Sequence, residues 1–170
     1  MTTPITVANQ EWTILSGIAT ALSAATVGGA TVFKTVTVTA SPEQARECQF
    51  KGTAPIAIVR YIGTDEKPLI EGEAMGVASV EVIVATKKDR GVDESLAVQE
   101  GLRLINAVKN AVAAGPPTVA YAVGTDGQFA YACEWGSPRI ETNAGDSDAP
   151  WITATIPVKF GMNFGSGTSH

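Results

Sequence analysis

The sequence has almost no histidine and little cysteine. Its 170 residues include one histidine, His170, at the last position, and two cysteines, Cys48 and Cys133. Nucleophilic catalysis by histidine needs an imidazole held within hydrogen-bond reach of its partners, and a residue at the end of a Gly/Ser/Thr-rich tail is not held in that way. The same scarcity removes most zinc and transition-metal sites. The composition therefore predicts a protein that is not an enzyme, with no catalytic residues, no metal and no cofactor.

Charge is also scarce, and it is not gathered into a basic stripe. Charged residues make up 17% of the sequence and the net charge is −5, whereas soluble domains usually contain about 25% charged residues. Binding to nucleic acid by counterion release needs clustered Lys and Arg. Direct DNA or RNA binding is therefore not expected, and a surface so poor in charge suggests that part of it is covered in the working state. The two distant cysteines form no C-x-x-C pair and are interpreted as small buried thiols in a reducing compartment.

No membrane span or signal peptide is expected. The uncharged stretch from Trp12 to Phe33 is long enough to cross a bilayer, but hydroxyl side chains interrupt it and Gly28-Gly29 breaks it. The N-terminal residues lack both a basic region and an apolar region of the kind that a signal peptide has.

Two groups of carboxylates invite a chemical interpretation and do not support one. Asp146 and Asp148 resemble a sparse calcium loop, but the twelfth-position Glu and the full spacing are missing. Glu71 and Glu73 alternate as a glycosidase pair might, but no aromatic sugar platform lies beside them. Both groups are interpreted as solvated surface.

Two long helices are predicted. The first covers residues 11–27 and ends at Gly28-Gly29, and the second begins at Asp93-Glu94-Ser95 and ends at residues 115–117. The first has a buried stripe of Ile14, Leu15, Ile18, Ala21, Leu22 and Ala25. The second has a stripe of Val98, Gly101, Leu102, Ile105, Val108 and Val112 and a charged side in water. The opposite side of the first helix is polar but uncharged, which suggests a contact with another subunit.

The remaining segments predict a sheet and a short helix. Strands are expected at 31–39, 55–62, 77–86, 118–123, 128–135 and 151–160, and a helix capped by Ser41 at 41–48. Residues 63–76 form a long loop or a protruding hairpin, and residues 136–150 a long polar loop. Pro157 places the last strand at a sheet edge or a bulge. The sum is a single α+β domain over residues 1–170, with a mostly antiparallel or mixed sheet of about five or six strands, two long helices packed on one face, and a flexible tail at 161–170.

The element order resembles that of the tail terminator (tail completion) proteins of long-tailed bacteriophages. The similarity lies in the helix ILSGIATAL, the strand PIAIVRY, the helix DESLAVQEGLRLINAVKNAV and the closing strand WITATIPVKFGM. It is a resemblance of pattern that covers nearly the whole chain.

The resemblance implies a structural virion protein, assembled in the host cytoplasm and located at the head-proximal end of the tail. Six copies would form a homohexameric ring that caps the tail tube protein, ends its polymerisation and offers a surface to the neck or connector protein of the head. DNA would pass through the ring without specific binding. The residues expected at subunit or ring contacts are Ser16, Thr20, Ser23, Glu66, Lys67, Glu71, Glu73, Arg139, Glu141, Asp146 and Asp148.

Two other functions stay open at this point. The first is another ring component of the same particle, a neck adaptor or a tube subunit. The second is a small-ligand-binding or enzymatic α+β domain, which a ligand in a deep apolar pocket would favour.

Overall fold

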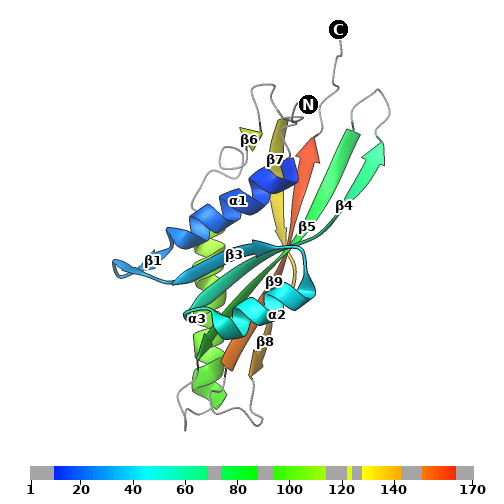
Figure 1. Cartoon of the computed structure of the whole chain (residues 1–170). Helices are drawn as coiled ribbons and strands as arrows, with labels where there is room; N and C mark the ends of the chain where they lie inside the picture. The colour runs from blue at the N-terminus through cyan, green and yellow to red at the C-terminus, as the bar shows by residue number, and fades with distance from the viewer. Residues whose placement is uncertain are drawn as a thin grey trace, which may run out of the picture.

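A seven-stranded mixed sheet organises the protein (Figure 1). The structure is a computed structural model, and it describes residues 10–68, 74–87, 94–113, 122–123, 128–142 and 151–163. The helices are α1 (Gln10–Ser23), α2 (Pro42–Lys51) and α3 (Glu94–Ala113). The strands are β1 (Thr26–Val27), β2 (Ala30–Thr31), β3 (Thr35–Thr39), β4 (Ile56–Pro68), β5 (Ala74–Lys87), β6 (Ala122–Val123), β7 (Gln128–Trp135), β8 (Arg139–Thr142) and β9 (Trp151–Asn163).

The strand order is β3-β4-β5-β9-β7-β6, and β8 pairs with β9 beside β7. Only the β3–β4 pair is parallel among these pairings, and the others are antiparallel. β1 and β2 form a separate hairpin. The predicted fold class is thus confirmed, with one more strand in the sheet than the sequence indicated.

Helices cover the two faces of the sheet unequally. α1 and α3 pack on one face, where they bury the main core together with the alternate residues of β4, β5 and β9. α2 packs on the other face over β3 and β4, where Ala45 meets Ile56 and Ile58. Because α2 has only 10 residues, a large part of this second face has no helix over it among the described residues.

The buried strands follow the alternation that the sequence predicts. Val80, Val82 and Val84 on β5 are buried under the helices, whereas Glu81 and Ile83 between them are only partly buried. Burial of each such aliphatic side chain contributes about 1.5–3 kcal/mol. β9 repeats the pattern with Ala154, Ile156, Val158 and Phe160.

The first helix is shorter than predicted. The helix ends at Ser23. Of its predicted stripe, Ile14, Leu15, Ile18 and Leu22 are buried, whereas Ala21 is half-buried and Ala25 lies beyond the helix. Gly28 and Gly29, at φ of 60° and 82°, do not end it: they form the two-residue turn between β1 and β2. Successive residues in the left-handed region match a type I′ hairpin turn, which glycine accommodates without steric cost. The strand expected at 31–39 is correspondingly split into β2 and β3.

The second long helix lies where the sequence places it, but part of its stripe is wrong. Gly101, Ile105, Val108 and Val112 are buried, together with Ala97, Leu104 and Ala107. Val98 and Leu102 are 42% and 48% exposed. The sheet contacts a side of α3 rotated away from the stripe that we expected.

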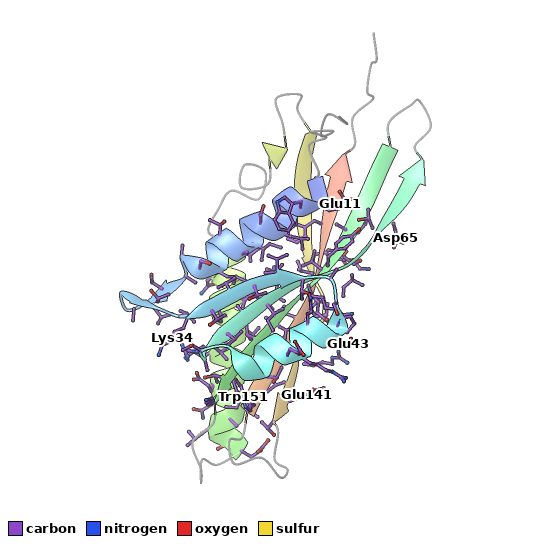
Figure 2. All side chains as sticks on the ribbon, viewed as in Figure 1. Glu11, Lys34, Glu43, Asp65, Glu141 and Trp151 are labelled. Carbon is purple, nitrogen blue, oxygen red and sulfur yellow. The ribbon has the colours of Figure 1, made fainter. Side chains whose placement is uncertain are left out.

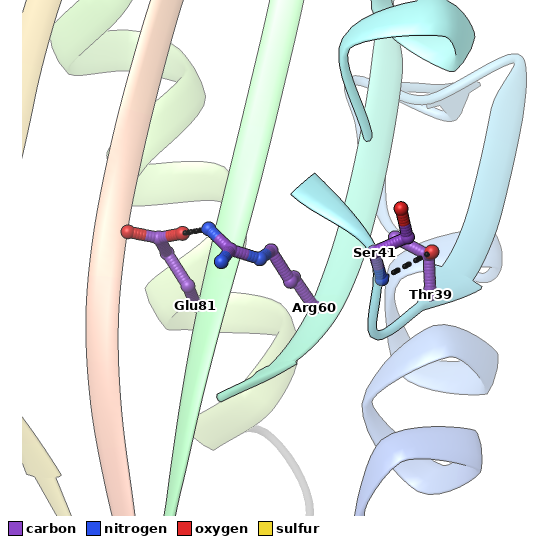
Figure 3. Close-up of polar contacts among 4 residues, drawn as sticks. All are labelled: Thr39, Ser41, Arg60 and Glu81. Atoms are coloured by element: carbon purple, nitrogen blue, oxygen red, sulfur yellow. Dashed lines mark hydrogen bonds and ion pairs between the residues drawn. The ribbon is translucent and has the colours of Figure 1, made fainter. Parts of the chain in front are cut away.

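The cap of α2 is confirmed. The amide of Gln44 donates to Ser41 Oγ at 3.3 Å. Gln44 does not complete a reciprocal capping box, because its Oε1 accepts from Thr39 Oγ1. The amide of Ser41 donates to the same Thr39 hydroxyl at 3.1 Å (Figure 3).

The closing strand β9 is not an edge strand, which corrects the interpretation of Pro157. β9 lies between β5 on one side and, on the other side, β7 and β8, each of which pairs with β9. Pro157 faces the short break, residues 136–138, where β7 has ended and β8 has not begun. The predicted loop at 136–150 is wrong in the same region, because Arg139–Thr142 form β8.

Two alternatives were open for residues 63–76, a long loop or a protruding hairpin. The structure shows a hairpin. β4 and β5 stay paired out to Pro68 and Ala74 (Figure 1). β4 extends past its other neighbour β3, whose Thr39 lies opposite Arg60, whereas β5 stays paired with β9 out to Met75.

The flexible tail predicted at 161–170 is wrong at its start, because residues 161–163 belong to β9. Residues 164–170 and the end of the second helix at 115–117 lie outside the described residues, as do the side chains of Cys48 and Cys133.

Candidate interaction surfaces

The outward side of α1 is polar and uncharged, as predicted. Thr20 and Ser23 are exposed and Ser16 is half-buried. Thr20 Oγ1 donates to the carbonyl of Ser16 at 2.9 Å, and Ser23 Oγ donates to the carbonyl of Ala19 at 2.8 Å. These bonds satisfy the hydroxyls within the helix, so the surface can be covered by a protein partner without leaving unpaired donors. Trp12, 57% exposed, lies at the start of the same side.

The structure places Arg139 and Glu141 together on β8. They pair in register with Thr155 and Thr153 of β9. Ile140 between them packs against α3, so Arg139 and Glu141 point to the opposite face of the sheet, the face that carries α2. Both side chains are exposed.

The other expected contact residues are spread over two hairpins and a loop. Glu66 and Lys67 lie at the outer end of β4, opposite Gly76 and Met75, and their side chains are outside the described residues. Glu71, Glu73, Asp146 and Asp148 also lie outside the described residues. Figure 2 shows that Asp65, just before the first of these groups, lies far from Glu141, so the candidates do not form one continuous site.

One surface was missed by the sequence interpretation. The β1–β2 hairpin projects from the end of α1, with all four strand residues exposed and Val27 at 54% (Figure 1). The signal that could have found it is Gly28-Gly29 flanked by Thr-Val and Ala-Thr, which is a hairpin pattern. A hollow of about 480 Å³ beside it is lined by small residues that include Ala21 of α1, Ala25 just after this helix and Ala107 of α3.

The face of the sheet that carries α2 also carries an ion pair. Arg60 Nη1 of β4 lies 3.0 Å from Glu81 Oε2 of β5, and both side chains are mostly buried (Figure 3). Beyond the pair, a hollow of about 340 Å³ is lined by residues that include Ile62, Glu134 and Lys159.

The polar groups of the helix-covered face are used for structure. Tyr61 Oη lies 2.6 Å from Thr64 Oγ1, which donates to Glu11 Oε1 at 3.2 Å. The chain of bonds attaches the start of α1 to β4. On the outward side of α3, the hydrogen bonds from Arg103 to Glu100 raise the pKa of the Arg103 guanidinium above its usual value.

The described part of the chain contains no group of three or more His, Cys, Asp or Glu side chains that could hold a metal ion. No helix in the same residues is both long and apolar enough to cross a bilayer. No protein-family model matches the sequence, and no curated protein is significantly similar to it. The described residues present to other molecules an uncharged side of α1, the β1–β2 and β4–β5 hairpins and the charged strand β8.

Proposed function

We propose that this protein is a structural component of a phage virion, a ring-forming tail terminator. In this role several copies cap the last ring of the tail tube, end its polymerisation and present a different surface to the neck proteins of the head. A tube grows because each ring exposes a docking surface, and a terminator covers that surface without reproducing it. The element order that resembles the tail terminators supports this role.

The observation that carries the proposal is the uncharged outward side of α1. A helix side that faces water normally carries Lys, Glu or Arg, and the outward side of α3 does, with Glu100 and Arg103. α1 instead exposes Thr20, Ser23 and Trp12. Burial of this side against a second copy would stabilise the assembly. A monomeric enzyme would have no such use for an uncharged helix side.

The acidic balance fits a ring around a DNA channel. At a net charge of −5, the protein offers no basic stripe that would hold phosphates, so DNA can move through the ring.

A complementation experiment tests the function. Purified protein is added to tails assembled without their terminator, and electron microscopy measures the tail length and the fraction of tails joined to heads. We expect a fixed length and restored joining. Long tubes of irregular length, or filaments formed by the protein alone, contradict the proposal, and filaments favour a tube subunit.

A substitution in α1 tests the surface that carries it. Thr20→Lys places a long charged side chain at an exposed position and should abolish ring formation without changing the thermal unfolding midpoint. Gln99→Lys is the matched control, because Gln99 is an exposed position on the outward side of α3. Normal rings from the Thr20 variant would remove α1 from the interface.

A further inference from the structure

The sheet has two edges that nothing protects within the described residues. β3 pairs only with β4, and β8 pairs only with β9. Edge strands are usually blocked by Lys, Pro or a bulge, because their free backbone groups pair with other chains. The β3 sequence TVTVT has none of these, and its register with β4 has no shift.

The two edges are complementary in direction. β3 runs parallel to β4, and β4 and β9 are both antiparallel to β5, so β3 and β9 run the same way. β8 is antiparallel to β9 and therefore opposite to β3. When copies follow one another head to tail, β8 of one copy meets β3 of the next as an antiparallel pair.

The two edges also lie at the same height in the sheet. One row of paired residues contains Thr35, Ile56, Ala85, Thr153 and Glu141. A second row contains Thr37, Ile58, Ile83, Thr155 and Arg139. A head-to-tail contact without axial displacement closes into a ring, whereas a displaced contact produces a helical filament. Equal height therefore favours a ring.

Charges on the α2-bearing face are complementary across such a contact. α2 starts near Thr39 and runs back along β3 (Figure 1). In this direction it exposes Glu43 first and Arg46 second. β8 exposes Arg139 in the row of Thr37 and Glu141 in the row of Thr35. In the direction in which α2 runs, Arg139 therefore comes before Glu141. α2 also exposes Glu47, and Arg46 lies about 200° around α2 from Gln44, whose side chain bonds to Thr39 of β3. The acid and base that can meet when the two edges adjoin are therefore Glu43 and Arg139.

On the helix-covered face, Val98 and Leu102 of α3 are 42% and 48% exposed. At 100° per residue they lie about 180° around α3 from Ala107 and Ala111, which line the hollow shared with α1. This exposed apolar side of α3 therefore lies at the β8 edge.

We propose that β8 of one copy pairs with β3 of the next, so that the sheets of neighbouring copies join edge to edge around the ring. The partner of each edge is a second copy of this chain, and the inference rests on the proposed ring function. On the face that carries α2, Glu43 meets Arg139 of the neighbouring copy. On the other face, the exposed apolar side of α3 faces the neighbouring copy.

A charge-reversal cycle tests the pairing. One variant carries Glu43→Arg, a second carries Arg139→Glu, and a third carries both changes. The third preserves the net charge, and each changes only exposed side chains. Sedimentation measures self-association, and electron microscopy counts capped tube ends. Either reversal alone should weaken association at least about tenfold, and the combined variant should recover to within about threefold of the original protein.

The control is reversal of the exposed Glu100–Arg103 pair, which should change neither readout. Equal association of all variants, or no recovery in the combined variant, overturns the edge pairing. If all variants cap tubes as the original protein does, the edge pairing is wrong and the proposed function stands. If the cycle shows loss and recovery but no variant caps a tube, the pairing stands and the tail function is wrong. An original protein that neither self-associates nor caps tubes overturns both.

Discussion

The amide of Gly136 donates a hydrogen bond to the carbonyl oxygen of Pro157, with an N···O distance of 2.8 Å. In a strand the N and O of one residue point to the same side, so the nitrogen of Pro157, which has no hydrogen to donate, also faces the break between β7 and β8. A proline is thus tolerated in a central strand because the neighbouring strand is interrupted at that position. A Cβ on Gly136 would lie 2.9 Å from Pro157 Cβ.

Gly136→Ala should destabilise the protein by about 1–3 kcal/mol, because the rigid proline ring cannot move away from the new methyl group. Urea unfolding followed by fluorescence measures the change. Gly63→Ala is the matched control on β4: nothing lies within 4 Å of its Cβ position, and a change within about 0.5 kcal/mol is expected. Equal effects at the two positions would contradict the close contact.

Gly101→Ala should also destabilise, although alanine is intrinsically better in a helix by about 1 kcal/mol. The new Cβ would lie 2.9 Å from Ile140 Cγ2 and 3.1 Å from Cγ1, and a β-branched side chain cannot turn both atoms away. Combined with Ile140→Ala, the substitution should become neutral or stabilising. A double-mutant cycle should therefore give a favourable coupling of about 1 kcal/mol or more. Additive effects would mean that β8 is not seated on α3 as described.

Ser41→Ala should cost about 1 kcal/mol of stability, since it removes the oxygen that accepts from the Gln44 amide at the start of α2. The control is Ser23→Ala near the end of α1. Its hydroxyl bonds only to the carbonyl of Ala19, four residues earlier, so the change should stay within about 0.5 kcal/mol. Thermal and urea unfolding distinguish the two, and a larger loss at Ser23 would refute the assigned cap.

Glu81→Gln should destabilise by about 1–3 kcal/mol, because it leaves the mostly buried Arg60 guanidinium without its counter-charge. Glu100→Gln is the control. Its partner Arg103 has 46% of its side chain exposed, so solvent screens the pair and the loss should be below about 0.5 kcal/mol. Similar losses at the two sites would show that burial does not strengthen the Arg60–Glu81 pair.

Local patterns determined the elements and the core of this protein. The alternation of Val80, Val82 and Val84 is a property of the residue order, and so is the Ser41 cap, since a strand repeats every two residues and a cap needs contacts only three residues away. The uncharged side of α1 was readable for the same reason. The Gly28-Gly29 turn was readable in principle, but two glycines after an apolar stripe also match a helix end.

Only the tertiary structure decided which elements meet. The position of β9 inside the sheet depends on an interruption between β7 and β8, far from Pro157 in sequence. Which side of α3 is buried depends on where Gly101 lets Ile140 approach, and this left Val98 and Leu102 exposed. The equal height and opposite direction of β3 and β8 arise from four successive strand pairings. Such relations are set by the register between distant segments, and the order of residues in one segment does not contain them.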